Sequence, residues 1–590
     1  MGASMRWITI CLSLPAFSFA QATLSLSPAT KAASAGVSAP LDASFAGFGI
    51  EPSNLFSFTG GANTNKFSVQ LLQNLADYSG TPPHIRLGGN TQDYMVFDDS
   101  FDAFEWKTNV QSTAQGTIAA DSMIIGPSYF KALDRFPTGT PVTYGLNLAY
   151  SGSDYVERVV AGARAALNGM KNVKLYSFEI GNEPDLYLQN QMRSGSWGGH
   201  VYTKQFLERA TAVYNQVLKP AGLPASFFEG PATASTIGTT FEIDTLVKNG
   251  LIDKVNGSNY ISAWNQHDYF YFIGVSNVPL TLNDLMNLDN TNSQFAYWEK
   301  QVAKGLDTGL PYVLREMSSV GPIGMHGVSD AFGAALWTLN FFLYAASLNI
   351  SSVQLHMTDN SNASAWQPIN MYGKDPFVRP QYYAHVAMAQ IVGNGNGTTQ
   401  IDVLNIDKVP SDYKGRLRAF TAYANSNLQA VILINSKQAN ASSTNKVSFT
   451  FKVNFGSNNA DKDVFLSYLT ADGADSLTGT TFNGVSYSDL DGKASTVNDT
   501  VTTLRTSSSG SVSISVRDSQ AVIANLNWLL GSNAVLTSNS TSARPTPKKS
   551  TAGPTMMGGA STAVFTGVVT MTLALARLCI YGGVLGLRRA

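Results

Sequence analysis

The amino-acid sequence predicts an α/β protein in which an eight-stranded parallel βα barrel, of the TIM type, precedes an antiparallel β-sandwich. Three observations lead to this fold class. Short apolar runs alternate with segments of helical period from residue 44 onward. After about residue 400, apolar residues alternate with period two between turns rich in Asn, Gly, Ser and Asp. A nearly apolar segment that begins at Asp330 has the composition of a buried helix.

The barrel is expected over residues 44–392, because eight apolar runs in this range can each supply one strand. Amphipathic segments between them, such as 67–78, 155–170 and 201–218, supply helices. An open parallel sheet is the alternative interpretation of the same alternation. In chain order the runs are "SFAGFGIE", "HIRLGGN", "PVTYGLNL", "KLYSFEIGN", "SFFEGPA", "ISAWNQHDY", "PYVLRE" and "SSVQLHM".

The β-sandwich is expected over residues 393–532. Segments such as "GRLRAFTAYA", "LQAVILINSK" and "KVSFTFKVNF" alternate apolar and polar residues, as strands with one buried face do. The stretch "ATLSLSP", within residues 23–43, has the same pattern. We therefore expect an N-terminal strand that joins the sandwich.

Both ends of the chain carry targeting signals. Residues 1–22 combine Arg6, an apolar run and small residues, which is typical of a secretory signal peptide. Residues 533–562 form a Ser/Thr/Pro-rich stalk, and residues 563–590 form a hydrophobic tail. The tail is either a lipid-anchor (GPI) signal or a membrane span, and Arg577 within it favours the lipid anchor. Both alternatives place the protein outside the cell, attached to its surface.

Composition excludes several classes of function. The net charge is −1, with 39 basic and 40 acidic residues and no basic run, so nucleic acid is not an expected partner. The two cysteines, Cys11 and Cys579, lie in the terminal segments, which excludes disulfides and cysteine metal sites from the mature protein. We expect a monomeric glycoprotein, with candidate glycosylation sites at Asn256, Asn349, Asn362, Asn396, Asn440, Asn498 and Asn539.

Two glutamates lie where a barrel enzyme carries its catalytic groups. Glu183 follows the fourth run, and Glu316 closes the seventh. Barrel enzymes use the C-terminal ends of strands, and strands four and seven face each other across the mouth. A retaining glycosidase needs two such carboxyl groups, one as acid/base and one as nucleophile, and the charge of one raises the pKa of the other.

The motifs "EIGNEPD", "LREMSSVG", "IRLGGNTQDY" and "NQHDYF", in these strand positions, resemble glycoside hydrolase family 79, which comprises β-glucuronidases and heparanases. The resemblance covers about residues 25–530. It implies that Glu183 is the acid/base and Glu316 the nucleophile, and that no cofactor is needed. It further implies that Asn182 holds the sugar 2-hydroxyl and that Tyr269 steadies the nucleophile.

Five more residues are candidates for the sugar site. The resemblance implies that Arg86 keeps the nucleophile ionised, while pairing with Glu179 inside the barrel is an equal alternative. Asn90 and Asp93 lie on the loop after the second strand, within reach of sugar hydroxyls, with Asp93 preferred. His267 and Tyr372 are candidate cleft residues, and packing is the alternative for both.

Two further expectations concern residues within these motifs. Strand alternation predicts that Arg315 points opposite to Glu316 and is structural. The His and Asp of "HDY" have no second histidine at ligand spacing, so no metal site is expected.

The predicted function is that of a β-glucuronidase that removes terminal glucuronic acid, including its 4-O-methyl form, from glycans or proteoglycans. The loop "MSSVGPIGMHG" after Glu316 lacks a tyrosine that the glucuronidases of the family use for the uronic carboxylate, which leaves the sugar open. The alternatives are a heparanase-like endo-hydrolase, a cell-wall transglycosylase, and a non-catalytic surface carbohydrate-binding protein. Near-neutral composition argues against the heparanase-like alternative.

Overall fold

The computed structural model describes residues 23–113, 115–235 and 239–531. The predicted signal peptide, stalk and hydrophobic tail, and the sequon at Asn539, lie outside the described residues. Within the described residues, no helix combines the length and the apolar character that crossing a bilayer requires.

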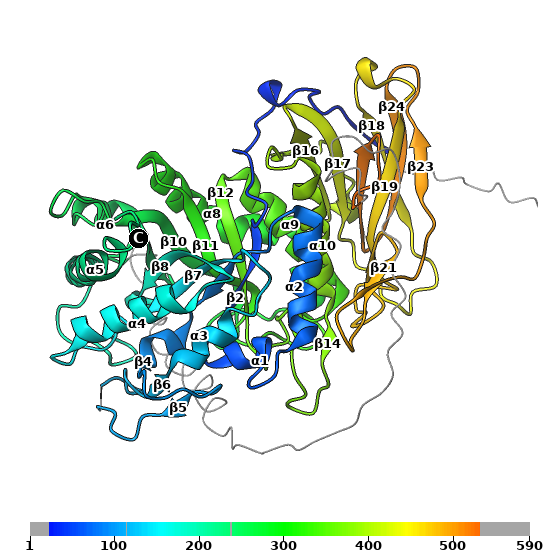
Figure 1. Ribbon diagram of the computed structural model, residues 1–590. Helices are drawn as coiled ribbons and strands as arrows, with labels where there is room; N and C mark the ends of the chain where they lie inside the picture. The colour runs from blue at the N-terminus through cyan, green and yellow to red at the C-terminus, as the bar shows by residue number, and fades with distance from the viewer. Residues whose placement is uncertain (1–22, 114, 236–238, 532–590) are drawn as a thin grey trace, which may run out of the picture.

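A closed barrel of eight strands forms the larger part of the protein (Figure 1). All neighbouring strands are parallel, and the last strand pairs with the first, so the barrel prediction is confirmed and an open sheet is excluded. In chain order the strands are β2 (Ala46–Ile50), β3 (Ile85–Leu87), β7 (Pro141–Leu146), β8 (Lys174–Ile180), β9 (Phe228–Thr233), β10 (Ile261–Phe272), β11 (Tyr312–Gly321) and β12 (Ile350–Met357).

Helices between these strands cover the outside of the barrel. Helix α9 is buried from Phe332 to Ala346, as its apolar sequence predicts, because it and α10 lie between the barrel and the sandwich. The helices are α1 (Leu55–Thr59), α2 (Lys66–Ser79), α3 (Pro127–Leu133), α4 (Tyr155–Gly169), α5 (Gly199–Val213), α6 (Ile243–Lys248), α7 (Leu282–Leu285), α8 (Leu288–Asp307), α9 (Phe332–Ser347) and α10 (Pro380–Asn394).

The long connection after β3 carries a small sheet of its own, and a shorter strand pair follows β12. The small sheet consists of β4 (Met95–Phe97), β5 (Lys107–Thr108) and β6 (Met123–Ile125), and the pair of β13 (Trp366–Gln367) and β14 (Phe377–Val378). Both insertions belong to connections that leave the C-terminal ends of barrel strands, where a substrate site is expected.

Antiparallel strands after the barrel form two packed sheets, as predicted. The strand β1 (Thr23–Leu26) pairs in parallel with β18, so the N-terminal segment belongs to the smaller sheet. The larger sheet contains β15 (Gln400–Val403), β16 (Leu417–Ala424), β17 (Asn427–Asn435), β19 (Asp463–Thr470), β20 (Thr481–Phe482), β21 (Val485–Tyr487), β22 (Ala494–Thr496), β23 (Thr502–Arg505) and β25 (Gln520–Leu526), and the smaller sheet contains β1, β18 (Ser448–Asn454) and β24 (Ser511–Arg517).

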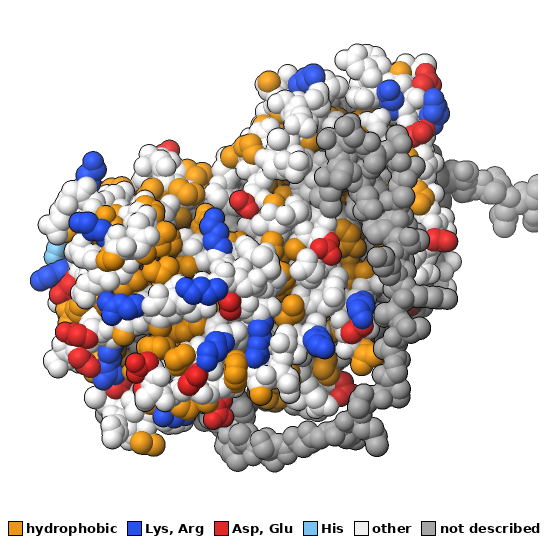
Figure 2. Space-filling model, viewed as in Figure 1, with side chains coloured by type: hydrophobic (Ala, Val, Ile, Leu, Met, Phe, Trp, Pro, Cys, Tyr) orange, Lys and Arg blue, Asp and Glu red, His pale blue; other side chains and the backbone are white. Residues whose placement is uncertain are grey.

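The surface carries charges of both signs. On the face drawn in Figure 2, Lys and Arg side chains are interspersed with Asp and Glu over both the barrel and the sandwich. This pattern agrees with the balanced composition of the chain.

A glycine at the first barrel strand permits the closest approach between β2 and β3. A Cβ atom at Gly47 would lie 2.1 Å from the carbonyl oxygen of His84, which accepts the hydrogen bond from Phe48 N. We expect Gly47→Ala to lower the free energy of unfolding by about 3 kcal/mol, because backbone rather than a flexible side chain must move.

Gly162→Ala is the matched control, since Gly162 lies within α4 and a Cβ there meets only Leu146 at 3.8 Å. This substitution is expected to stabilise the protein by up to about 1 kcal/mol. Thermal unfolding of the two variants measures both effects, and equal melting temperatures would contradict the close contact.

Candidate active site

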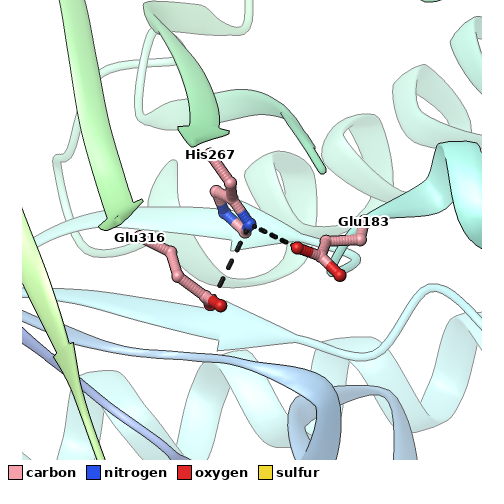
Figure 3. Close-up of side chains that lie close together, drawn as sticks. All are labelled: Glu183, His267 and Glu316. Carbon is pink, nitrogen blue, oxygen red and sulfur yellow. Dashed lines mark hydrogen bonds and ion pairs between the residues drawn. The ribbon is translucent and has the colours of Figure 1, made fainter. Parts of the chain in front are cut away.

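Glu183 and Glu316 come together at the C-terminal end of the barrel. Glu316 lies on β11, and Glu183 follows β8 with left-handed backbone angles, φ 48° and ψ 53°. The backbone N–H of Glu183 donates to the carbonyl oxygen of Ala232, within β9, at 2.8 Å. Figure 3 shows both carboxyl groups directed toward the ring of His267, which β10 contributes.

The distance between the two carboxyl groups indicates the type of hydrolysis that they support. One oxygen of Glu183, one oxygen of Glu316 and one ring nitrogen of His267 all lie within 4.8 Å of one another. Retaining glycosidases hold their two carboxyl groups about 5–5.5 Å apart, whereas inverting enzymes leave room for a water at about 6.5–9.5 Å. The pair therefore has the short spacing that direct attack on a sugar carbon requires.

Arg86 connects the nucleophile candidate to the barrel interior. Its Nη1 lies 2.5 Å from Glu316 Oε2, and its Nη2 lies 2.5 Å from Glu179 Oε1 and 2.8 Å from Asn182 Oδ1. The two alternatives predicted for Arg86 are therefore realised together. Glu179 is fully buried and also accepts from Asn265 Nδ2 at 2.5 Å, so it lies inside the barrel as expected.

Glu316 is held in its ionised form. Burial alone would raise its pKa, but the positive charges of His356 and Arg86 and the hydrogen bond from Tyr269 outweigh burial and lower the pKa well below its usual value. The Tyr269 hydroxyl donates to Glu316 Oε1 at 2.7 Å. The carboxylate is therefore available as a nucleophile at neutral pH.

Glu183 is in the opposite state. Burial, followed by the negative charge of Glu316, raises the pKa of Glu183 to about 8. At neutral pH this carboxyl group therefore carries a proton, while its neighbour does not. Such a separation of two pKa values within one site is what an acid and a nucleophile require.

His267 orients Glu183. Burial lowers the pKa of His267 to about 4, so the ring is neutral at neutral pH. Its Nε2 faces the Arg86 guanidinium at 3.4 Å, and because a guanidinium only donates, Nε2 must be the unprotonated nitrogen. Nδ1 then carries the hydrogen and donates to Glu183 Oε1 at 3.2 Å. The other oxygen of Glu183 is left to carry the acidic proton.

Asn182 and Asn90 lie beside the pair. The Oδ1 of Asn182 accepts from Arg86, and its Nδ2 donates to Asn90 Oδ1 at 3.2 Å. Asn182 is almost fully buried, and Asn90 lies at the start of the short helical turn after β3. The two side chains therefore form one edge of the site, as the positions of their motifs predict.

Asp93 does not have the predicted role of contacting sugar hydroxyls. Its side chain is buried, and four protein donors occupy its two oxygens. Leu148 N and Ala149 N donate to Oδ1, while Asn182 N and the hydroxyl of Tyr187 donate to Oδ2. With its acceptor positions filled, Asp93 fixes the loop that presents Asn182 and Glu183.

Tyr372 lies at the tip of a two-residue turn between β13 and β14. Both Tyr372 and Gly373 have positive φ, of 55° and 72°, and the turn is closed by hydrogen bonds between Met371 and Lys374. The Tyr372 side chain is 42% exposed. It is therefore an exposed turn residue, and its role in the substrate site stays a prediction.

Arg315 and Glu316 both point into the barrel, which corrects the prediction that they point in opposite directions. The register between β10 and β11 shifts at this position, because Gln266 faces Leu314 and His267 faces Glu316. Arg315 is the extra residue, and such a bulge turns two successive side chains to one face. Its guanidinium pairs with Glu229 of β9 at 2.7 Å and donates to Gln354 of β12.

Sequence analysis missed two residues of the site, His356 and Glu51. His356 Nδ1 lies 3.6 Å from Glu316 Oε2, and His356 Nε2 lies 3.7 Å from Glu51 Oε2. Both residues stand at strand ends, His356 in β12 and Glu51 directly after β2. The rule that found Glu183 and Glu316, a polar residue closing an apolar run, also applies to the runs "SSVQLHM" and "SFAGFGIE".

The cluster of Glu183, His267 and Glu316 has donor atoms close enough for a metal ion, but its electrostatics favour another use. Arg86 and Tyr269 already donate to the two oxygens of Glu316. A cation would have to displace these donors and lie next to a guanidinium. We therefore interpret the cluster as an acid, a nucleophile and the ring between them.

The predicted glycosylation sequons differ in exposure. The side chains of Asn256, Asn349, Asn396 and Asn498 are exposed, while those of Asn362 and Asn440 are half-buried. Asn362 Oδ1 accepts from Lys374 Nζ at 2.8 Å, and Asn440 Oδ1 accepts from Gln438.

A family model and two curated relatives match this chain. Residues 419–523 match the model of the glycosyl hydrolase family 79 C-terminal beta domain. A β-glucuronidase of Aspergillus niger is 31% identical over 468 residues, which cover 75% of this chain and 82% of the relative. A β-glucuronidase of Neurospora crassa is 28% identical over 499 residues, which cover 77% of this chain and 86% of that protein.

A solved structure shares the fold over almost the whole described chain. The 4-O-α-L-rhamnosyl-β-D-glucuronidase of Fusarium oxysporum superimposes with a TM-score of 0.66 at 23% identity, covering 85% of this chain and 100% of that one. A family 51 α-L-arabinofuranosidase of Bifidobacterium longum superimposes with a TM-score of 0.55 at 12% identity, covering 85% and 99%. With the identity and coverage of the Aspergillus relative, these findings show that the chain belongs to glycosyl hydrolase family 79.

Proposed function

We propose that the protein is a retaining β-glucuronidase that releases terminal glucuronic acid, or its 4-O-methyl form, from glycans. The observation that carries the proposal is the close pair Glu183 and Glu316, of which one is protonated and the other ionised at neutral pH. The two curated relatives are both named β-glucuronidases, which supports a uronic acid as the sugar.

In the first step, Glu316 attacks the anomeric carbon while Glu183 gives its proton to the oxygen of the leaving group. The C–O bond to the leaving group breaks, and a glycosyl ester forms on Glu316. Tyr269 and Arg86, which donate to the two oxygens of Glu316 in the free enzyme, hold the carboxylate in position for attack. Asn182 is proposed to donate to the sugar 2-hydroxyl from the edge that it shares with Asn90.

In the second step, Glu183 acts as a base. Esterification removes the negative charge of Glu316, which after burial is the largest cause of the raised pKa of Glu183. The pKa of Glu183 then falls, and its carboxylate takes a proton from the water that hydrolyses the ester. One residue can therefore serve first as acid and then as base.

Hydrolysis of a phenyl β-glucuronide is expected to decline above about pH 8, where Glu183 loses its proton. Because the pKa of Glu183 is raised, the acidic form is present below that pH and lost above it, about tenfold per pH unit. The variant Glu183→Gln is expected to lose about 10²–10⁴-fold in kcat/KM on this substrate and to lose this pH dependence.

An activated leaving group provides the internal control. On a dinitrophenyl β-glucuronide, whose leaving group needs no proton, the loss of kcat/KM in Glu183→Gln should be much smaller. Equal losses on both substrates would contradict the role of Glu183 as the acid. A panel of aryl β-glucosides and β-xylosides, hydrolysed as fast as the glucuronide, would contradict the sugar assignment alone.

We further infer that the protein is secreted as a monomeric glycoprotein and held at the cell surface by its C-terminal tail. The signal-like residues 1–22 and the stalk and tail of residues 533–590 support this inference. The exposure of Asn256, Asn349, Asn396 and Asn498 also supports it, since an attached glycan needs space around the asparagine.

A further inference from the structure

His356 lies between two carboxyl groups at the ends of three neighbouring barrel strands. Its ring is buried, with Nδ1 at 3.6 Å from Glu316 Oε2 and Nε2 at 3.7 Å from Glu51 Oε2. Nδ1 makes no hydrogen bond within the described residues. A Cβ at Gly49 would lie 3.2 Å from this nitrogen, so the glycine leaves the space that the ring occupies.

Charged and titratable groups from five barrel strands surround His356. Glu51 follows β2, Arg86 lies on β3, Glu183 follows β8, His267 lies on β10 and Glu316 on β11. His267 is neutral at neutral pH. Both ring nitrogens of His356 therefore face negative charge, which favours the imidazolium form, in which each nitrogen carries a proton.

The charge of His356 decides how negative the site is. When His356 is protonated, the three carboxylates Glu51, Glu179 and Glu316 face two cations, His356 and Arg86. When His356 is neutral, the same three carboxylates face Arg86 alone. A uronic acid brings one more negative charge into this partly desolvated site, whereas a neutral sugar does not.

We propose that the proton on His356 is what allows this site to accept an anionic sugar, so that pH sets its selectivity between uronic acids and neutral sugars. His356 acts here through the charge of Glu51 and Glu316, as a positioning residue. The inference rests on the proposed glucuronidase function and deepens it, because it assigns the tolerance of a fourth negative charge, that of the sugar, to one side chain.

The direction of the pKa agrees with the geometry. Burial alone would lower the pKa of His356, but the charges of Glu316 and Glu51 outweigh burial and raise it above its usual value. The cation therefore persists to higher pH than in a free imidazole and is lost as the pH rises through the raised pKa. Binding is reciprocal: the factor by which the proton on His356 raises the affinity for an anionic sugar equals the factor by which the sugar raises the affinity of His356 for the proton.

Two dinitrophenyl substrates that differ only in charge test the proposal, the β-glucuronide and the neutral β-glucuronamide. Because their leaving group needs no proton, loss of the acidic proton of Glu183 does not slow the first step, which kcat/KM reports, and the charge that Glu183 gains on ionisation acts equally in wild type and His356→Gln. For the wild type, kcat/KM on the glucuronide should fall about 10–100-fold as His356 loses its proton, while that on the glucuronamide stays nearly level.

Two variants of opposite expectation make the test specific. His356→Gln removes the imidazolium, so the ratio of glucuronide to glucuronamide kcat/KM should fall about 10–100-fold at low pH, where wild-type His356 is protonated, and should lose the decline that titration of His356 causes. Glu51→Gln removes one of the two carboxylates that hold the proton on His356, so the decline should persist but move to lower pH. Simple structural damage would not displace the decline in this way.

The outcomes distinguish failure of the proposed role of His356 from failure of the proposed glucuronidase function. A decline that persists unchanged in His356→Gln, or that is equal on both substrates, overturns the role of His356. A wild type that does not prefer the glucuronide to the glucuronamide at any pH overturns the glucuronidase function itself. If His356→Gln fails to fold, the shift of one imidazole titration between wild type and Glu51→Gln, followed by NMR of ¹³C-labelled histidines, decides the question.

Discussion

Glu316→Ala is expected to reduce kcat/KM on an aryl β-glucuronide by about 10⁴-fold or more, because no other carboxylate lies where the anomeric carbon is attacked. Its oxygens are held by Arg86 at 2.5 Å and Tyr269 at 2.7 Å, and no neighbouring side chain shares both contacts among the described residues. Steady-state hydrolysis of the aryl glucuronide by the purified variant measures the loss.

Rescue by a small anion gives this prediction its control. Azide fits the space that the missing carboxylate leaves and should restore part of the activity, with the product an α-glycosyl azide. Glu157→Ala, which removes an exposed carboxylate on α4, should keep the full activity. An active Glu316→Ala, or rescue that yields a β-glycosyl azide, would contradict the assignment of the nucleophile.

Arg86→Met is expected to lower the free energy of unfolding by about 3–5 kcal/mol and to reduce activity as well. Arg86 is fully buried and pairs with two carboxylates, Glu179 and Glu316, so its removal leaves two buried negative charges without their main partner. Arg86→Lys should recover only part of the loss, because a single ammonium group cannot bridge both in the way the planar guanidinium does.

A double variant separates charge from packing in this prediction. Arg86→Met combined with Glu179→Gln removes one of the two orphaned charges, so it should be more stable than Arg86→Met alone. Arg505→Met is the control, since Arg505 and Asp463 form an exposed pair on the sandwich whose loss should cost less than about 1 kcal/mol. Equal melting temperatures for the Arg86 and Arg505 variants would exclude the proposed electrostatic support.

The fold class and the meeting of Glu183 with Glu316 at one end of the barrel could be predicted because both depend on regular spacing. Apolar runs mark the strands. Because the strands are parallel, a polar residue at the C-terminal end of any run lies at the same end of the barrel. Glu183 and Glu316 satisfy this rule on strands that face each other. The same rule reaches His356 and Glu51, but these residues belong to none of the motifs that carried the resemblance.

Other features could not be predicted because they depend on contacts between loops or on local irregularity. The sequence identifies Asp93 only as a polar loop residue. In the structure the loops after β3, β7 and β8 pack together, and groups from the latter two donate hydrogen bonds to the Asp93 carboxylate. Alternation along a regular strand predicts that Arg315 points away from the barrel interior. No sequence pattern marks the β-bulge that turns its side chain inward. Both predictions were wrong because side-chain periodicity describes a single regular strand and contains no information on contacts between loops or on bulges.

The pairing of β1 with β18 has a consequence for how the protein is made. Thr23 pairs with Thr450, so β1 cannot form this pairing until the chain some 430 residues further along has been synthesised. At typical synthesis rates of about 5–20 residues per second, that partner emerges on the order of a minute later. During this time the barrel, which lies between the two strands in sequence, can fold while β1 remains an unpaired edge. A chain that ends before β18 would therefore leave its first strand without this partner, even though the segments that carry Glu183 and Glu316 have already been made.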